Sequence, residues 1–194
     1  MRIIAGSLKG RRLRTPSWDG LRPTSDRLRE TLFNVLAGRV AGALVLDGYA
    51  GTGALGIEAL SRGAAGVVFV ERDRRAAALV AENLRHCGVS EGCAIIRADV
   101  GRMSRPAGSR PFDVILLDPP YAVADLSECV EAVAPWLAAG GVLVLEHARR
   151  RVPPATAGGL TLSRVLPSGD SALSFYRHGG ADALTAGDSG TSAP

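Results

Sequence analysis

The sequence predicts a doubly wound α/β domain, in which a mostly parallel sheet is covered by helices on both faces. Five short apolar runs, at residues 44–46, 67–70, 94–96, 114–117 and 142–145, have the length and composition of buried strands. Segments with apolar residues at three-to-four spacing, typical of amphipathic helices, separate several of these runs. Continuous apolar strands that alternate with helices indicate a parallel sheet buried on both sides.

Three helices are expected between these strands, at residues 55–62, 75–87 and 126–137. After Pro153 and Pro154 the pattern changes to alternating residues, which predicts two further strands at 160–166 and 172–176. The turn-rich residues 167–170 would join them as an antiparallel hairpin. The sheet would then have seven strands.

An extension is predicted before the sheet, at residues 1–38. Residues 2–14 are expected to form a basic β-hairpin that turns near residues 6–10, and residues 23–26 would cap a helix whose apolar side includes Leu28 and Leu32. We expect this extension beside the sheet edge or over its mouth. The main domain would cover 39–178, and residues 179–194, which have few large apolar groups, are expected to be a disordered tail.

Composition limits the class of protein. The chain has 194 residues, 46% of them hydrophobic, which predicts one main domain. The first residues lack the apolar stretch of a signal peptide, and no run approaches the roughly 20 apolar residues of a membrane span, so we expect a cytoplasmic protein. Cys87, Cys93 and Cys129 lack metal-site spacing, so reduced thiols and no bound metal are expected, even with His86 beside Cys87.

Charge is concentrated near the amino terminus. Residues 1–30 hold eight basic and three acidic residues, a net charge of +5, so that the remainder is −1. A basic arm on a nearly neutral body indicates a polyanionic partner. A solvated surface would give the same pattern.

A glycine-rich loop after the first strand indicates a nucleoside cofactor. Gly51, Gly53 and Gly56 match G-x-G-x-x-G, and the loop opens a predicted helix. Glu71 follows the second strand, twenty residues after Gly51, where an acid binds ribose hydroxyls.

Two cofactors compete for this loop. A dinucleotide would place its pyrophosphate at the helix amino terminus, whereas S-adenosylmethionine carries an ammonium and a sulfonium group that favour acids. Asp47 supplies such an acid at the end of the first strand, and Asp99, at the end of the third, could accept from the adenine amino group, although an ordinary loop-starting Asp or helix cap would look the same. Together with Glu71 these acids favour S-adenosylmethionine. The predicted cofactor-binding residues are Asp47, Tyr49, Ala50, Gly51, Thr52, Gly53, Glu71, Arg72, Asp99 and Val100.

The predicted active centre is Asp118-Pro119-Pro120-Tyr121, at the end of the fourth strand. An exocyclic base amine is a poor nucleophile, so an enzyme must stabilise the positive charge that develops on its nitrogen. The Asp118 carboxylate and the Pro119 carbonyl are suitable acceptors, while Tyr121 offers a ring on which a flipped base can stack. The acceptor-only Asp118 favours the donor-rich edge of guanine over adenine.

At this level of detail the sequence resembles the RsmD family of bacterial 16S rRNA guanine-N2 methyltransferases, from Arg2 to about Tyr176. The features that carry the resemblance are residues 2–6, 9–11, 22–27, 29–30, 32–34, 46–47, 50–53, 55–64, Glu71 and 118–121. The resemblance implies a Rossmann-like class I methyltransferase fold and methylation of the guanine at position 966, in the usual rRNA numbering. The substrate would be 16S rRNA in an assembled or assembling 30S particle, and the enzyme a monomer.

The resemblance also assigns a role to the basic arm. Its side chains would hold RNA through phosphate contacts, which position the nucleic acid without reading its sequence. The implied RNA-binding residues are Arg2, Lys9, Arg11, Arg12, Arg14, Arg22 and Arg27.

Three alternatives remain. An adenine-N6 methyltransferase acting on RNA or DNA would use the same tetrapeptide. An NAD-dependent oxidoreductase would use the same glycine loop, but the chain lacks a Tyr-x-x-x-Lys pair and a well-placed catalytic histidine. A catalytically inactive RNA-binding module would keep the fold, and the presence of Asp118 and Glu71 argues against it.

Overall fold

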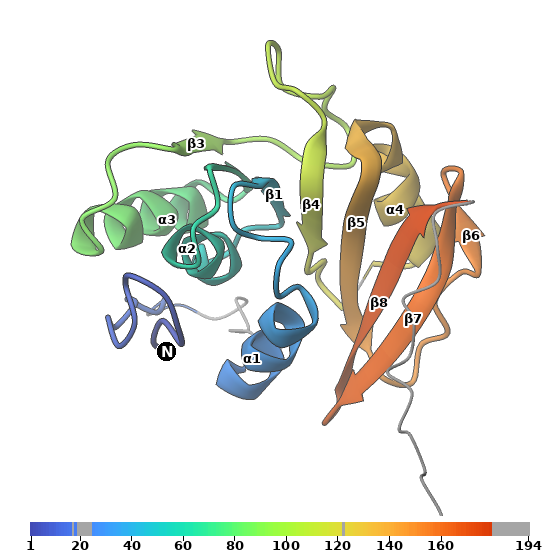
Figure 1. Ribbon diagram of the computed structural model, residues 1–194, viewed down its shortest axis with the longest axis horizontal. Helices are drawn as coiled ribbons and strands as arrows, with labels where there is room; N and C mark the ends of the chain where they lie inside the picture. The colour runs from blue at the N-terminus through green and yellow to red at the C-terminus, as the bar shows by residue number, and fades with distance from the viewer. Residues whose placement is uncertain (17, 19–24, 122, 180–194) are drawn as a thin grey trace, which may run out of the picture.

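The computed structural model describes residues 1–16, 18, 25–121 and 123–179, and it is built around one eight-stranded sheet (Figure 1). The strands lie in the order β3-β2-β1-β4-β5-β8-β7-β6. Their bounds are Leu44–Gly48 (β1), Gly66–Val70 (β2), Cys93–Ile96 (β3), Phe112–Leu117 (β4), Leu137–Ala148 (β5), Thr156–Ala157 (β6), Leu160–Ser168 (β7) and Ser171–His178 (β8). The helices are α1 (Asp26–Val35), α2 (Ala54–Ser61), α3 (Arg74–His86) and α4 (Leu126–Val133), with the short 3-10 helix η1 (Ala134–Trp136). The predicted α/β class is confirmed.

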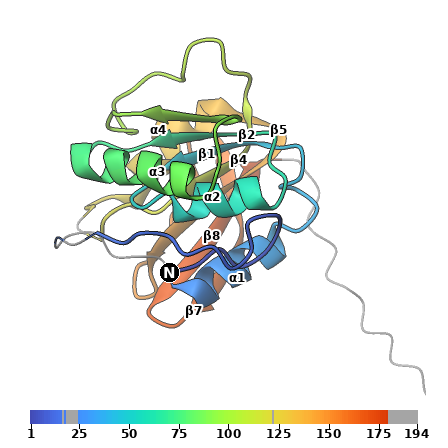
Figure 2. The same cartoon turned by 90° about the vertical axis from the view of Figure 1, so that its left-hand side faces the viewer.

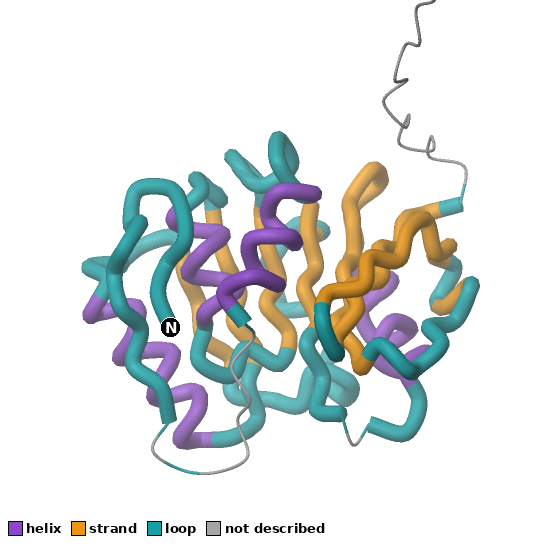
Figure 3. The backbone as a smooth tube through the Cα atoms, turned by 90° about the horizontal axis from the view of Figure 1, so that it is seen from below, coloured by secondary structure: helices purple, strands orange, loops and turns teal. Residues whose placement is uncertain are grey.

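The five strands from β3 to β5 are parallel, and both of their faces are covered. Helices α1, α2 and α3 share a core with one face of the sheet, which includes Val45 and Leu116. Helix α4 and η1 pack on the opposite face, against Leu46 and Ile115. In Figure 3 the strands form a continuous row across the molecule, with helices against it. The strand order reverses between β1 and β4, and open α/β sheets bind ligands at such a switch point.

The antiparallel end of the sheet contains one more strand than expected. The predicted hairpin is confirmed, because β8 pairs with both β5 and β7. The additional strand is β6, which has two residues and pairs with the start of β7. Two residues are too few to give an alternating pattern, so the sequence predicted seven strands where the sheet has eight.

The helix predicted at residues 126–137 is shorter in the structure. Helix α4 ends at Val133, the 3-10 turn η1 follows, and β5 already begins at Leu137. Pro135 explains the early end, because it has no backbone N–H and cannot continue the α-helical hydrogen bonds. Buried residues recur at three-to-four spacing through Leu137, at Leu126, Cys129, Val130, Val133, Ala134, Trp136 and Leu137, which gives the segment the apolar pattern of a longer helix.

The predicted amino-terminal hairpin is present as a loop that has no strand ladder within the described residues. A single antiparallel bridge joins Arg2 to Arg12, beside hydrogen bonds such as that from the Ile3 amide to the Arg11 carbonyl, 2.9 Å. The expected capped helix follows as α1, whose Ser25 hydroxyl accepts from the Leu28 amide at 3.2 Å. Figure 2 shows the loop beside α1 and α2. The loop therefore packs on a helical face of the domain, instead of along a sheet edge.

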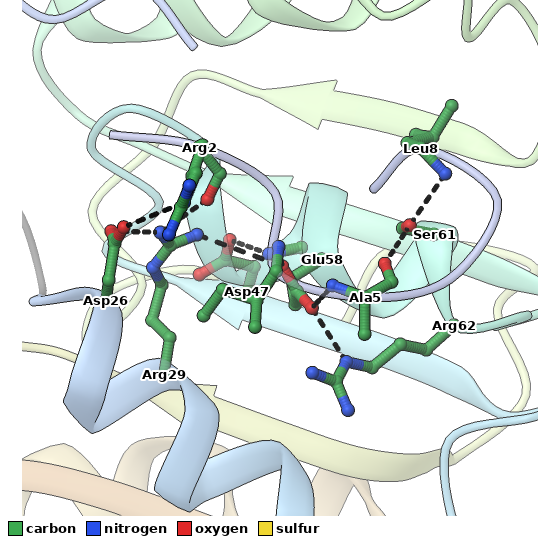
Figure 4. Close-up of polar contacts among 11 residues, drawn as sticks. Arg2, Ala5, Leu8, Asp26, Arg29, Asp47, Glu58, Ser61 and Arg62 are labelled. Carbon is green, nitrogen blue, oxygen red and sulfur yellow. Dashed lines mark hydrogen bonds and ion pairs between the residues drawn. The ribbon is translucent and has the colours of Figure 1, made fainter. Parts of the chain in front are cut away.

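Helix α2 holds this loop in place through buried polar groups (Figure 4). The carboxylate of Glu58, which is fully buried, accepts hydrogen bonds from the Ile4 and Ala5 amides at 2.7 and 3.0 Å. Gly6 makes the approach possible, because a Cβ there would lie 1.8 Å from the Ser61 carbonyl oxygen. These contacts explain why the ladder is not longer, since the Ile4 and Ala5 amides donate to α2 instead of across the hairpin.

Arginine side chains complete this arrangement, which we call the clasp and define as residues 1–8 with Arg29, Glu58, Ser61 and Arg62. The Arg62 Nε lies 2.7 Å from one Glu58 oxygen. Arg29, fully buried on α1, lies 3.9 Å from the other oxygen and donates to the Arg2 carbonyl at 2.7 Å. The clasp thus joins the loop, α1 and α2 around the buried carboxylate of Glu58.

Within the described residues, no helix is long and apolar enough to cross a membrane. The cysteines Cys87, Cys93 and Cys129 are free thiols. The predicted tail, apart from Gly179, lies outside the described residues.

Candidate active site

A cavity of about 620 Å³ opens at the carboxyl ends of β1, β2 and β4, a size typical of small-molecule sites. The predicted active centre and nine of the ten predicted cofactor residues line it. These lining residues are Asp47, Tyr49, Ala50, Gly51, Thr52, Glu71, Arg72, Asp99, Val100, Asp118, Pro119, Pro120 and Tyr121. The structure therefore brings together residues that the sequence separates by more than seventy positions.

Gly53 is the predicted cofactor residue that does not line the cavity. It caps α2 in the left-handed conformation, with φ of 78°, and a Cβ there would lie 3.1 Å from Val80. Gly56 is needed for packing, because a Cβ would meet the Phe69 ring at 2.2 Å. These two glycines let α2 start sharply after the loop and lie close on β2.

Asp47 is the most deeply buried acid of the cavity, with 1% of its surface exposed. Its Oδ2 accepts a hydrogen bond from the Gly56 amide at 2.8 Å. Burial raises the pKa of Asp47 to about 8, and the charges of Asp118 and Glu71 add to the effect, against the Gly56 hydrogen bond. A cation bound in the cavity would favour the ionised form of this carboxyl group.

The other two strand-end acids each contact loop backbone. Glu71, after β2, accepts from the amides of Gly51 at 2.9 Å and Asp73 at 2.8 Å. Asp99 is more exposed, accepts from the Gly101 amide at 3.0 Å and lies 4.0 Å from the Arg72 guanidinium. A carboxylate offers about four acceptor positions, so both acids can also accept from hydroxyl or amino groups of a ligand.

The cavity is strongly acidic overall. Seven carboxylates line it, against the guanidinium groups of Arg72 and Arg75. The acids are Asp47, Glu71, Asp73, Asp99, Asp118, Glu146 and Asp170. Such a lining attracts a cationic ligand and repels a pyrophosphate, which disfavours the dinucleotide alternative.

The predicted active centre lies at the end of β4. Asp118 follows Leu117 directly, and the two prolines lead into a turn in which the Pro120 carbonyl accepts from the Val123 amide at 2.9 Å. Tyr121 has 40% of its surface exposed, and its hydroxyl lies 2.9 Å from the Ser171 Oγ. A tyrosine fixed by its hydroxyl, with an exposed ring, is a suitable stacking platform at the rim.

Sequence reasoning missed several cavity residues. Glu146 on β5 follows an apolar run just as Asp47, Glu71 and Asp118 do, so the same signal was available for it. Ser171, at the start of β8, had no such signal. Trp18, Ser25 and Leu28 also line the cavity, so the start of α1 borders its mouth.

The predicted RNA-binding residues lie on the amino-terminal surface, and all except Arg22, which is outside the described residues, are exposed. Three of them have partners within the chain. Arg14 pairs with Glu82, the Arg11 guanidinium donates to the His86 carbonyl at 3.4 Å, and Arg2 lies 3.8 Å from Asp26. Lys9, Arg12 and Arg27 complete the exposed set.

Comparison with known proteins identifies relatives over nearly the whole chain. The model of a family described as conserved hypothetical protein 95 matches residues 1–177. Ribosomal RNA small subunit methyltransferase D of Escherichia coli strain K12 is 35% identical over 179 residues, which cover 91% of this chain and 89% of the relative. The protein of the same name from Haemophilus influenzae is 34% identical and covers 92% and 94% of the two chains.

Solved structures share the fold. The Escherichia coli protein yhhF superposes with a TM-score of 0.78 at 34% identity, over 92% of this chain and 97% of that one. The rRNA methyltransferase aviRa from Streptomyces viridochromogenes has a TM-score of 0.68 at 18% identity, over 83% and 88% of the two chains. The fold is therefore shared with a protein of only 18% sequence identity.

Proposed function

Because the chain belongs to the RsmD family, we propose that it transfers a methyl group from S-adenosylmethionine to the exocyclic N2 amine of a guanine in 16S rRNA. The target would be the guanine at position 966 in the usual numbering, within an assembled or assembling 30S particle. One observation carries the proposal: Asp118 and Tyr121 line the same acidic cavity as the glycine loop and the strand-end acids. The enzyme would act as a monomer in the cytoplasm.

The residues of the cavity fit the proposed cofactor. Asp47 and the surrounding acids suit its positive charges, and the cavity volume suits its size. Glu71 would accept from the ribose hydroxyls and Asp99 from the adenine amino group. When bound, S-adenosylmethionine would supply an electrophilic methyl group next to the active centre.

The chain's own contribution to the chemistry is to bind and orient the amine. The lone pair of a guanine N2 amine is delocalised into the ring, so attack by this nitrogen creates positive charge on it. The Asp118 carboxylate and the Pro119 carbonyl would accept hydrogen bonds from the amine hydrogens and stabilise that charge. Two consecutive prolines hold the backbone extended and provide no competing N–H donors.

The RNA would reach this site with the target base out of its stack. A paired base cannot enter the cavity, so the base would be flipped or unpaired and would stack on the exposed ring of Tyr121. Lys9, Arg11, Arg12 and Arg27 would hold neighbouring phosphates. Arg2 and Arg14 belong to the same proposed contact surface, and Arg22 stays in the proposed set from its place in the sequence.

The proposal is tested by supplying radiolabelled S-adenosylmethionine with small subunits from cells that lack the modification, in parallel with naked 16S rRNA. We expect label in the particle, at one guanine, as N2-methylguanine. Label at an adenine N6 would support the alternative methyltransferase, and no transfer to either substrate would contradict the proposal. Mapping by mass spectrometry separates these outcomes.

A further inference from the structure

Glu146 is a buried carboxylate of the cavity to which the proposed reaction assigns no role. It lies on β5, with 7% of its surface exposed, and lines the same cavity as Asp118. Leu145, which precedes it, pairs with Leu117, which precedes Asp118. Asp118 is the first residue after β4 and so lies next to Glu146 of β5, at a point where neighbouring strands are about 4.8 Å apart along the hydrogen-bonding direction.

Both carboxylates also lie on the same face of the sheet. Leu116 on β4 and Val144 on β5 belong to the core under α1 and α2. Side chains two positions apart on a strand point to the same side, which places Asp118 and Glu146 on this face. Figure 1 shows β4 and β5 side by side at the centre of the sheet. The amine-binding acid thus has a second acid directly beside it.

A chain of hydroxyl groups joins Glu146 to the proposed stacking ring. The Ser171 Oγ donates to the Glu146 Oε1 at 3.1 Å and lies 2.9 Å from the Tyr121 hydroxyl. Because the Ser171 hydroxyl donates its proton to the Glu146 carboxylate, its oxygen accepts a hydrogen bond from the Tyr121 hydroxyl. This chain positions the ring and the carboxylate relative to one another at one end of the cavity.

The chemistry of guanine fits two neighbouring acceptors. Its Watson–Crick edge presents two adjacent donors, N1–H and N2–H₂, whereas adenine presents an acceptor at N1 beside its amine. An ionised carboxylate can only accept. Asp118 and Pro119 are assigned to the amine, so a second acceptor beside them would meet N1–H.

We propose that Glu146 accepts a hydrogen bond from guanine N1–H and is thereby the residue that selects guanine over bases with an acceptor at that position. This inference rests on the proposed function and deepens it. In a base whose N1 carries a lone pair, that nitrogen and the Glu146 carboxylate would both be acceptors facing one another. This arrangement costs more binding free energy than the loss of a neutral contact.

The test uses a base that keeps the reacting amine but has no hydrogen on N1 and no carbonyl oxygen at C6. 2-Aminopurine has the exocyclic N2 amine but an unprotonated N1 acceptor. Particles are reassembled with 16S rRNA ligated to carry guanine or 2-aminopurine at the target position, and methyl transfer is measured as kcat/KM. The wild-type protein should prefer guanine by about 100-fold or more.

The Glu146→Gln variant should change this preference. Glutamine keeps the size of the side chain and can donate to the N1 acceptor, so we expect transfer to guanine to fall by roughly 10- to 100-fold and the guanine preference to shrink by at least about 10-fold. Glu131→Gln is the matched control, because Glu131 is an exposed carboxylate on α4. This control should leave both rates unchanged.

Binding of S-adenosylhomocysteine, measured by calorimetry, separates selection from folding and should be retained in Glu146→Gln. An unchanged guanine preference, or an equal loss on both bases, would overturn the role of Glu146. A wild-type protein that methylates neither particle would overturn the proposed function itself, and the inference with it.

Discussion

The cavity and the clasp each bury a carboxylate, and the two carboxylates differ in what surrounds them. Glu58 in the clasp is held by two arginines and two backbone amides, all from this chain. Asp47 in the cavity accepts from one amide and lies near two other acids, Asp118 and Glu71. A buried charge is stable when it is paired. In the clasp the partners of Glu58 come from the chain itself, whereas the acids of the cavity would be stabilised by a bound cation.

The partners of a buried carboxylate distinguish a structural site from a candidate binding site better than its degree of burial does. Both carboxylates are almost fully buried, at 0% and 1% exposure. Burial raises the pKa of Asp47 to about 8, and strongly perturbed pKa values cluster at functional sites. Helix α2 contributes to both regions, since its first turn borders the cavity and its later residues form the clasp.

The largest expected effect breaks the clasp. Among the described residues, Glu58→Ala leaves the buried Arg29 with Asp26 as its remaining acidic partner, so the free energy of unfolding should fall by about 3–5 kcal/mol. Urea unfolding followed by circular dichroism measures this loss. Glu82→Ala, which removes the half-buried partner of Arg14 at the surface, is the control and should cost less than about 1 kcal/mol. An equal loss of unfolding free energy in the two variants would contradict the view that the buried pairs of Glu58 stabilise the fold more than a surface ion pair does.

Removing Asp118 should affect chemistry with little effect on stability. Asp118→Ala takes away a proposed acceptor of the amine hydrogens, so kcat should fall about 10²- to 10³-fold. The affinity for S-adenosylhomocysteine should change little, because the glycine loop and Glu71 remain. Asp118→Asn keeps one acceptor oxygen and should lose less. Near-full activity of the alanine variant would contradict the charge-stabilisation argument.

The raised pKa of Asp47 predicts a pH dependence of stability. An unfolded aspartate ionises near pH 4, whereas this one ionises near 8, so the folded state holds an extra proton between these values. The stability that Asp47 contributes is therefore lost as pH rises. Relative to Asp47→Asn, the wild-type free energy of unfolding should fall by roughly 1 kcal/mol per pH unit between about pH 5 and 8. If the free energy of unfolding changes with pH in the same way in both proteins, the pKa of Asp47 is not raised.

The smallest expected effect concerns the exposed basic surface. Replacing Arg11 and Arg12 by alanine should weaken binding to small subunits and reduce the slope of log K against log salt by about one to two. Filter binding at several salt concentrations measures this slope. Arg164→Ala, an exposed arginine on β7, should leave it unchanged. If the double variant behaves like this control, the arm does not contact RNA.

The parallel strands and the strand-end acids could be predicted because each depends on a local pattern. An apolar run followed by an acid marks Asp47, Glu71, Asp99 and Asp118, and the parallel topology alone then places them at one edge. The clasp could not be predicted, because Glu58 and Ile4 meet only through packing of α2 against the loop. Arg29 contributes to the basic amino-terminal charge but is buried, since sequence does not distinguish an arginine that pairs internally from one that faces solvent.

The ends of the sheet have a consequence for the protein in concentrated solution. An open sheet has two outer strands with unpaired backbone groups, and another chain can add to such an edge and start an aggregate. Here the outer strands are β3, with four residues, and β6, with two, while β5 and β8 lie inside. Within the described residues β6 pairs only with Leu160 and Thr161, so most of the nine-residue β7 forms the margin on that side. Short outer strands offer few hydrogen bonds to an incoming strand. The β3 margin is therefore protected from edge-to-edge association, and β7 is the margin at which another chain would find the longer row of backbone groups.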